Sequence, residues 1–147
     1  MPEAIGVIGI ACPHEHPLLG CVALVAPAIA MGNTVVVIPS EPHPLSATDL
    51  YQVFDTSDLP AGVVNIVTGA RDLLTRVLAE HDDVDALWYF GTAAGSTLVE
   101  EASAGNMKRT WVNYGHPRAW HDPVQGAGPE FLREATQVKN IWVPYGE

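Results

Sequence analysis

The sequence PLLGCVALVAPAIAMGNTVVVI occupies Pro17–Ile38 and decides how the chain folds. Its first part is apolar on nearly all sides, which predicts a buried helix over 18–31 with Pro17 in the first turn. Gly32 then supplies a left-handed stop, and residues 34–38 are a short run of β-branched side chains. Such a run is typical of a strand in a parallel sheet that helices cover on both faces.

A membrane span is an alternative interpretation of this stretch, because no charged residue occurs from Pro17 to Ser40. However, the stretch contains Gly20, Pro27 and the polar turn 32–34, and its last apolar run is β-branched. A buried helix, a turn and a buried strand therefore explain it better than one spanning helix. We expect no contact with a membrane.

Strands and helices alternate on both sides of this stretch. Short apolar runs predict strands, and apolar residues at helical spacing predict helices. The expected strands cover 5–11, 34–38, 63–67, 86–90 and 110–112, and the expected helices cover 18–31, 46–54, 70–80 and 94–104. Short right-handed crossovers between these elements predict an α/β fold, a Rossmann-like doubly wound parallel five-stranded sheet.

The composition excludes several classes of protein. The 147 residues suit one compact domain, and a formal net charge of −10 disfavours nucleic-acid binding because phosphate backbones are repelled. The cysteines, Cys12 and Cys21, match neither a disulfide framework nor a zinc motif, and their apolar surroundings predict inert core residues. We expect no metal site and a cytoplasmic location, since the N-terminus lacks a signal-peptide pattern.

The last third of the chain follows a different pattern. Closely spaced Pro and Gly residues in 115–129 predict an irregular linker, and residues 130–135 predict a short helix. Residues 138–143 predict a terminal strand with mixed faces. A lone terminal strand is not stable, so we expect this one to pair as an edge strand, with Trp142 at the interface.

Three segments resemble the aldehyde dehydrogenase superfamily. Gly6–Ile10 together with Leu24–Val37 resembles the family's NAD-binding domain, and Leu59–Gly69 (LPAGVVNIVTG) resembles a second family segment. Gln137–Val143 (QVKNIWV) resembles the family's C-terminal oligomerisation strand. The resemblance covers residues 5–112 and 130–145, and it implies NAD as the family's cofactor and pairing through the terminal strand.

The chain departs from the family pattern at the cofactor site. Ile38 replaces the family's ribose-binding lysine and donates no hydrogen bond, so Glu41 is the remaining ribose ligand that the resemblance implies. The family's pyrophosphate-side glycine motif is altered here, and its candidate residues are Gly91, Thr92, Gly95 and Ser96. They still open a helix whose N-terminal amides favour an anion. We expect no bound cofactor, or NAD held weakly at this degenerate site.

The family's catalytic groups have no counterpart in this chain, so we expect no catalytic residue. Glu15 stands in the place of the family's oxyanion asparagine, where a carboxylate would repel a developing oxyanion. Val112–His116 lacks the family's general-base glutamate, and no cysteine follows Cys21. The histidines on either side of Glu15 are expected in a solvated loop rather than at a metal or an acid–base site.

The expected organisation has three parts: a Rossmann-like domain over 1–115, a linker over 116–129 that replaces the catalytic domain, and a C-terminal helix and oligomerisation strand over 130–147. This resembles the non-catalytic C-terminal module of the two-module, family-sixteen aldehyde dehydrogenases. The resemblance implies self-association, or packing on an active aldehyde dehydrogenase module, through Val138, Ile141, Trp142 and Val143. Two alternatives are a fragment of an NAD(P)-dependent aldehyde oxidoreductase that retains cofactor binding and a small-molecule binding module that uses the degenerate cleft.

Overall fold

A five-stranded parallel sheet forms the centre of the computed structural model, which describes residues 1–146. Its spatial order is β4-β3-β2-β5-β6. The strands are β2 (Val7–Ala11), β3 (Thr34–Ile38), β4 (Val64–Ile66), β5 (Ala86–Tyr89) and β6 (Arg109–Val112). The prediction of an α/β fold with a Rossmann-like sheet of five parallel strands is confirmed.

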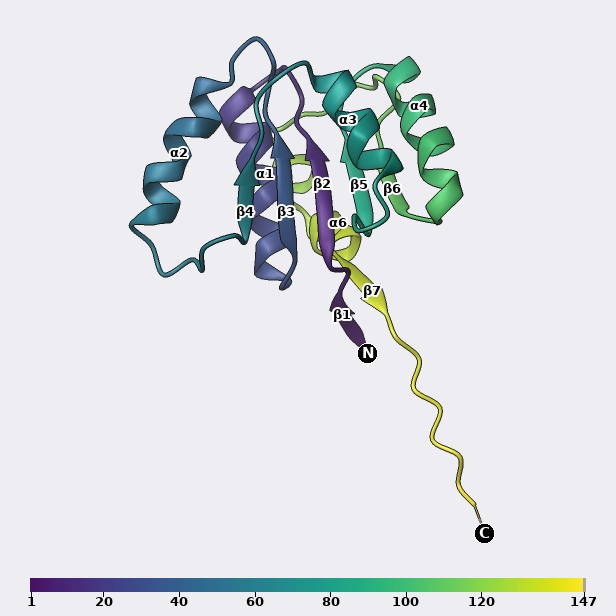
Figure 1. Cartoon of the computed structure of the whole chain (residues 1–147). Helices are drawn as coiled ribbons and strands as arrows, with labels where there is room; N and C mark the ends of the chain where they lie inside the picture. Colours follow the sequence, from purple (N-terminus) through teal and green to yellow (C-terminus); the bar gives the residue numbers. More distant parts are fainter. Residues whose placement is uncertain (147) are drawn as a thin grey trace.

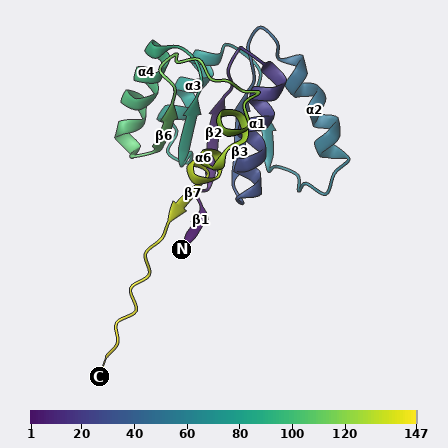
Figure 2. The ribbon, with the colours of Figure 1, turned by 180° about the vertical axis from the view of Figure 1, so that it is seen from behind.

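Helices cover both faces of this sheet (Figure 1). On one face α3 (Arg71–Glu80) packs against α4 (Ala93–Ser103), and a 3-10 turn (Ala104–Asn106) leads on to β6. On the other face lies α1 (Pro17–Ala30), which also contacts α2 (Leu45–Asp55) beside the β4 edge (Figure 2). Every side chain of β5, which lies beside the central strand β2, is buried as a result.

The stretch Pro17–Ile38 forms α1, a tight turn and β3, as predicted. Pro17 stands in the first turn of α1, and Gly32 takes a left-handed φ of 87° just after the helix. Leu24 and Ala28 of α1 are fully buried against the sheet. Within residues 1–146, no helix combines the length and the apolar character that crossing a membrane requires.

The segment 115–129 was expected to be an irregular linker, but part of it is helical. It contains α5 (Pro123–Ala127), which is followed directly by α6 (Pro129–Glu134). The carboxylate of Asp122 accepts hydrogen bonds from the backbone nitrogens of Val124 at 2.9 Å and Gln125 at 2.8 Å, and Pro123 occupies the first helical position. These are favourable helix-start features, so a run rich in Pro and Gly still forms a helical turn.

An aromatic cluster fixes this segment to the sheet. Trp120 and Phe131 are almost fully buried, and their rings pack edge-on against Phe90 and Trp111, with centroids 5.4 Å apart for Phe90–Trp120 and 5.3 Å apart for Trp111–Phe131. The guanidinium of Arg118 lies 4.8–5.8 Å from the centroids of all four rings. Each such cation–π contact contributes about 0.5–2 kcal/mol. The segment is therefore part of the core.

The side chain of Asn33 joins three parts of the chain and is buried. Its Oδ1 accepts hydrogen bonds from the backbone nitrogens of Ile5 at 2.7 Å and Gly6 at 3.0 Å. Its Nδ2 donates to the carbonyl oxygens of Ala28 at 2.9 Å and Ala135 at 2.8 Å. All of its hydrogen-bonding positions are used, so the end of α6 is held beside the end of α1 and the approach to β2.

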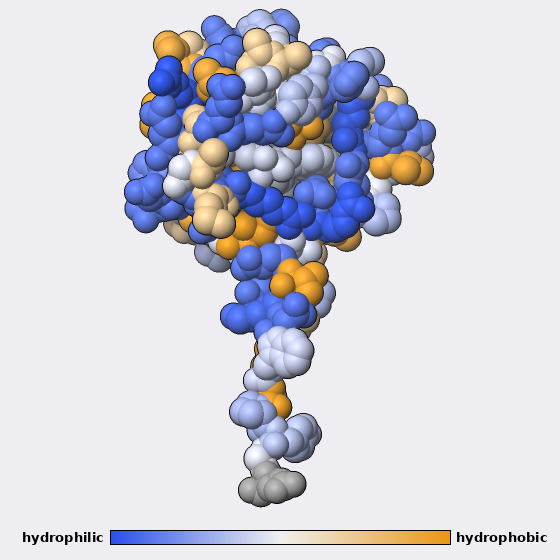
Figure 3. Space-filling model, turned by 90° about the vertical axis from the view of Figure 1, so that its right-hand side faces the viewer, coloured by the Kyte–Doolittle hydropathy of each residue, from blue (hydrophilic) through white to orange (hydrophobic). Residues whose placement is uncertain are grey.

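The two ends of the chain form a separate antiparallel ribbon. β1 (Pro2–Ala4) pairs with β7 (Thr136–Val138), from Pro2↔Val138 to Ala4↔Thr136. The terminal strand was expected over 138–143, whereas β7 covers Thr136–Val138 opposite β1. Residues 139–146, here called the tail, continue away from the body (Figure 3). Three of the expected interface residues lie in the tail and are exposed, namely Ile141, Trp142 and Val143.

Replacing Asn33 tests the joint between the two ends of the chain. We expect Asn33→Ala to lower the free energy of unfolding by about 2–4 kcal/mol, because the backbone nitrogens of Ile5 and Gly6 and the carbonyl oxygen of Ala135 lose their partner. Urea unfolding followed by circular dichroism measures the change. The matched control is Asn140→Ala in the exposed tail, which should leave the unfolding midpoint in place. A loss below about 1 kcal/mol for Asn33→Ala would contradict the role assigned to this side chain.

Candidate functional site

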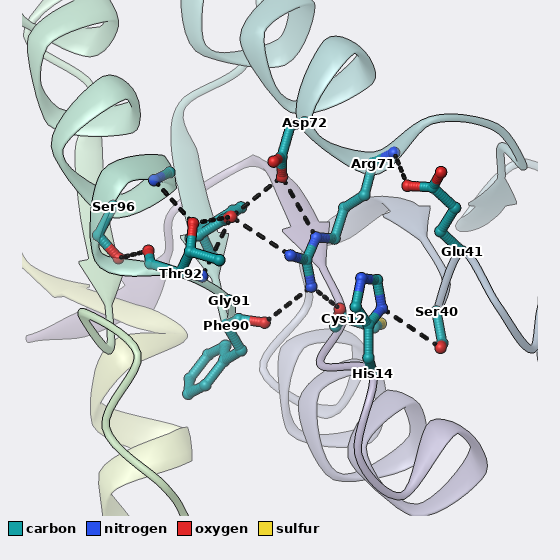
Figure 4. Close-up of polar contacts among 12 residues, drawn as sticks. Cys12, His14, Ser40, Glu41, Arg71, Asp72, Phe90, Gly91, Thr92 and Ser96 are labelled. Carbon is teal, nitrogen blue, oxygen red and sulfur yellow. Dashed lines mark hydrogen bonds and ion pairs between the residues drawn. The ribbon is translucent and has the colours of Figure 1, made fainter.

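The carboxyl ends of the parallel strands meet at one edge of the sheet, where ligands of open α/β folds bind. The strand order reverses between β2 and β5, because β3 and β4 lie to one side of β2 and β6 lies beyond β5. The crevice between the loops after β2 and β5 is therefore the candidate site. Figure 4 shows the polar contacts there, which also involve the loop after β3 and the starts of α3 and α4.

The guanidinium of Arg71, at the start of α3, fills this crevice. The residue is 4% exposed, and its Nη1 lies 3.4 Å from the carbonyl oxygen of Cys12 after β2 and 3.4 Å from that of Phe90 after β5. Nε lies 3.4 Å from a carboxylate oxygen of Asp72, and Nη2 lies 3.4 Å from the hydroxyl of Tyr89. A buried cation needs such acceptors around it. Arg71 thus links the two loops on either side of the crevice.

The ring of Tyr89, the last residue of β5, fills the space in front of α4. It is fully buried, and its hydroxyl donates to Asp72 at 3.0 Å and accepts from the backbone nitrogen of Thr92 at 3.3 Å. A Cβ atom at Gly91 would approach the Tyr89 hydroxyl to 2.6 Å, and one at Gly95 would collide with it. Both glycines therefore make room for this side chain.

The four residues expected at the degenerate motif come together at the start of α4, and their polar groups are used within the chain. Thr92 caps the helix, because its hydroxyl accepts the backbone N–H of Gly95 at 3.0 Å. The hydroxyl of Ser96 donates to the carbonyl oxygen of Thr92 at 3.1 Å and accepts from the backbone nitrogen of Tyr114 at 3.0 Å. Gly91 supplies the turn before Thr92. Between α3 and α4 a cavity of about 160 Å³ remains.

Glu41, the expected ribose ligand, lies in the loop after β3 and contacts the start of α3. Its carboxylate accepts a hydrogen bond from the backbone nitrogen of Arg71 at 3.0 Å. The first N–H groups of a helix have no partner inside the helix, so a carboxylate at this position stabilises the helix start. The preceding residue, Ser40, is fully buried, and its hydroxyl lies 3.4 Å from Nδ1 of His14.

The loop His14–His16 borders the crevice from the β2 side. Partial burial and the nearby Arg71 guanidinium lower the pKa of His14 below its ordinary value. Glu15 and His16 are exposed, and the ring of His16 packs edge-on against His121 with centroids 4.5 Å apart. Within residues 1–146, no three His, Cys, Asp or Glu side chains gather closely enough to hold a metal ion.

The two thiols lie in the core, as expected. Cys12, just after β2, and Cys21, in α1, are free and buried in the hydrophobic core. A hydrogen bond with Cys21 and the burial of the thiol raise the pKa of Cys12 well above its ordinary value. Cys12 therefore stays protonated at neutral pH, and a protonated thiol is a poor nucleophile.

Arg71 and Tyr89 are absent from the residues expected at the site. Two signals in the sequence point to them. Arg71 is the first Lys or Arg of an acidic chain, and it opens a helix two residues after Gly69. Tyr89 and Phe90 stand just before the altered glycine motif, so large rings are followed by a run of small residues there. Neither signal indicates that the two side chains meet, because only the sheet order brings α3 to the end of β5.

The family is decided by a match over most of the chain: residues 1–119 match the model of the Aldehyde dehydrogenase family. The chain belongs to the aldehyde dehydrogenase family. The NADP/NAD-dependent aldehyde dehydrogenase PuuC of Escherichia coli is 40% identical over 114 residues, which are 77% of this chain and 23% of PuuC. An aldehyde dehydrogenase of Aspergillus niger is 36% identical over 147 residues, covering 98% of this chain and 28% of the fungal protein.

Solved aldehyde dehydrogenase structures agree with this membership. The aldehyde dehydrogenase AldC of Pseudomonas syringae, solved as a C291A mutant with NAD+ and octanal, superposes with a TM-score of 0.73 at 40% identity. It covers 76% of this chain, which spans 23% of AldC. An indole-3-acetaldehyde dehydrogenase in its apo form gives a TM-score of 0.75 at 33% identity, over 78% of this chain and 27% of its own. The chain thus spans about a quarter of the length of these aldehyde dehydrogenases.

The pKa of His14 reports whether the Arg71 guanidinium lies in the crevice. Arg71→Met removes the neighbouring positive charge, so we expect the pKa of His14 to rise toward its ordinary value, as measured by NMR titration of the ring protons. Arg76→Met is the matched control, because Arg76 lies on the same helix but is exposed and paired with Glu80. An unchanged His14 pKa in Arg71→Met would contradict the placement of the guanidinium.

Proposed function

We propose that this chain is a non-catalytic aldehyde dehydrogenase module with a structural and oligomerising role beside an active NAD-dependent aldehyde dehydrogenase. Among two-module enzymes, the sequence most resembles the non-catalytic C-terminal module of family sixteen. The single observation that carries this proposal is the network of Arg71, Tyr89 and Asp72, which occupies the crevice where the family's nucleotide would lie.

The space that remains around this network is small, which supports the proposal that no dinucleotide binds there. The cavity between α3 and α4 measures about 160 Å³, whereas pockets for small molecules and cofactors typically measure about 300–1,000 Å³. The hydrogen-bonding groups of Thr92 and Ser96 are satisfied within α4 and its neighbours. In this arrangement the residues do not fit a pyrophosphate group, and we propose that NAD binds weakly or not at all.

The remaining ligands of the family's cofactor and reaction are also missing or engaged. Ile38 stands in place of the ribose-binding lysine, and the carboxylate of Glu41 is held by the backbone of α3. Glu15 introduces a negative charge where the family stabilises an oxyanion. The side chains of Cys12 and Cys21 are buried in the hydrophobic core between α1 and the sheet. These features support a module that performs no oxidation of its own.

The tail supports the oligomerising half of the proposal. Ile141, Trp142, Val143 and Tyr145 expose between 66% and 98% of their surface. Large apolar side chains on an extended segment are suited to strand addition, in which the backbone pairs with the edge of another sheet and alternate side chains enter pockets. We propose that a second copy of this chain, or an active aldehyde dehydrogenase module, receives the tail together with Val138. The two free thiols support a cytoplasmic location, where thiols remain reduced.

Titration with NAD separates this proposal from the alternative of a cofactor-binding fragment. Calorimetry with NAD up to millimolar concentration should show no saturable heat, because Arg71 and Tyr89 occupy the crevice. An assay with an aldehyde and NAD should likewise show no reduction of the cofactor by this chain alone. Saturable binding of NAD in the micromolar range would overturn the proposal that the crevice is blocked. Oxidation of the aldehyde would overturn the proposal that the chain is non-catalytic.

Light scattering on a tail variant tests the oligomerising role. Trp142→Gln should lower the oligomeric mass toward that of a single chain, because Trp142 is 91% exposed in the segment proposed to pair. The matched control is Met107→Gln, since Met107 is equally exposed, at 92%, in the turn before β6. Equal masses for the parent chain and Trp142→Gln would contradict pairing through the tail, as would a single-chain mass for the parent.

A further inference from the structure

An apolar cavity of about 210 Å³ lies on the face of the sheet that α1 covers, between α1, α2, β3 and the edge strand β4. Every residue that lines it is apolar: Cys21, Val22, Val25, Ala26, Ile29, Val37, Leu50, Val53, Phe54, Val64 and Ile66. An apolar cavity of about 150 Å³ stays dry and is large enough to hold a benzene molecule. The cavity therefore has room for a hydrocarbon group of about six carbons.

The cavity exists because α2 does not lie flat on the sheet. Ala47 is the single buried residue of α2, and it lies near the start of the helix. Phe54, near the other end, is half-buried, and the side chains of Val64 and Ile66 on β4 below it are also only half-buried. The face of the edge strand is thus left partly open, beside the helix that Figure 1 shows beyond β4.

A second, more polar cavity of about 530 Å³ adjoins the first around Phe54, Val64 and Ile66, which line both. Its lining adds the carboxylate of Asp55 and the amide of Asn65. The amide nitrogen of Asn65 donates to the carbonyl oxygen of Gly62 at 2.8 Å, so the amide oxygen is the group left for a ligand. The side chains left to meet a ligand are therefore the carboxylate of Asp55, the amide oxygen of Asn65 and the hydroxyl of Tyr51. All three can accept a hydrogen bond, and Asp55 is the charged one.

The charges around the two cavities have one sign. α1 contains no charged residue, α2 contains Asp49 and Asp55 but no Lys or Arg, and residues 1–70 contain no Lys or Arg. An anionic ligand would therefore find no partner and would be repelled. A cationic group finds Asp55 and the oxygen of Asn65 next to the apolar compartment.

We propose that this double cavity binds a small molecule that joins a hydrocarbon group of about six carbons to a cationic amine. The hydrocarbon enters the compartment between α1 and α2, and the ammonium group donates hydrogen bonds to Asp55 and Asn65. The site shares no residue with the crevice of Arg71, so its test is independent of the proposed structural role.

Three probes with one chain and different head groups test this chemistry: hexylammonium, hexanol and hexanoate. Methyl NMR spectra of the parent chain are titrated with each probe at physiological salt. We expect saturable shifts of the methyl groups of Val25, Ile29 and Ile66, with no shift for Val99 on the other face of the sheet. Hexylammonium should bind at least about threefold more tightly than hexanoate, because an exposed charge pair adds a modest attraction. Absence of saturable shifts, or tighter binding of hexanoate, would overturn the proposal.

Two pairs of variants locate the parts of the site. Ala26→Phe places a ring at the mouth of the apolar compartment and should abolish binding of all three probes, whereas Ala30→Phe, exposed on the same helix outside the cavity, should not. Asp55→Asn should reduce the preference for hexylammonium over hexanol by about two- to fivefold, whereas the nearby exposed Asp58→Asn should preserve it. Methyl spectra also report whether each variant is folded. If either variant changed probe binding no more than its control, the probes would be bound by general attraction to the surface, and the proposed site would be wrong.

Discussion

The guanidinium of Arg71 has to be satisfied inside the protein, and this requirement arranges the residues around the crevice. Its partners are carbonyl oxygens at the ends of β2 and β5, so both loops turn toward the same point. Asp72 and the hydroxyl of Tyr89 complete its surroundings, and the buried ring of Tyr89 in turn requires glycine at positions 91 and 95. The Arg71 guanidinium therefore joins the two loops, and the Tyr89 ring beside it accounts for a glycine pattern that resembles a phosphate motif.

A second arginine has a comparable role on the opposite face of the sheet. Arg118 lies among four aromatic rings, two from the sheet edge and two from the segment that follows it. With the hydrogen bonds of Asn33 to Ala135 and to the approach to β2, this cluster fixes the region of α5 and α6 against the face shared with α1. The region of α5 and α6 thereby covers the part of β5 and β6 that α1 does not reach.

The sequence predicts the sheet well because its strands are buried on both faces and its helices are amphipathic or wholly apolar. The stretch Pro17–Ile38 carries turn, cap and periodicity signals that all agree, and the structure follows them. The site is less predictable. Gly91, Thr92, Gly95 and Ser96 lie together as the motif implies, but what occupies the space in front of them depends on Tyr89 and Arg71, which meet only through the strand order. The terminal strand is displaced for a similar reason, since β1 sets where β7 can pair.

The ribbon of β1 and β7 brings the two ends of the described chain to one place. The amino group of Met1 donates to the carbonyl oxygen of Lys139 at 2.9 Å, and the backbone nitrogen of Lys139 donates to the carbonyl oxygen of Met1 at 2.9 Å. The base of the tail is thus held by the first residues of the chain. Loss of the pairing in β1 would therefore free the base of the tail, although the two segments are separated by the whole length of the sheet domain in the sequence.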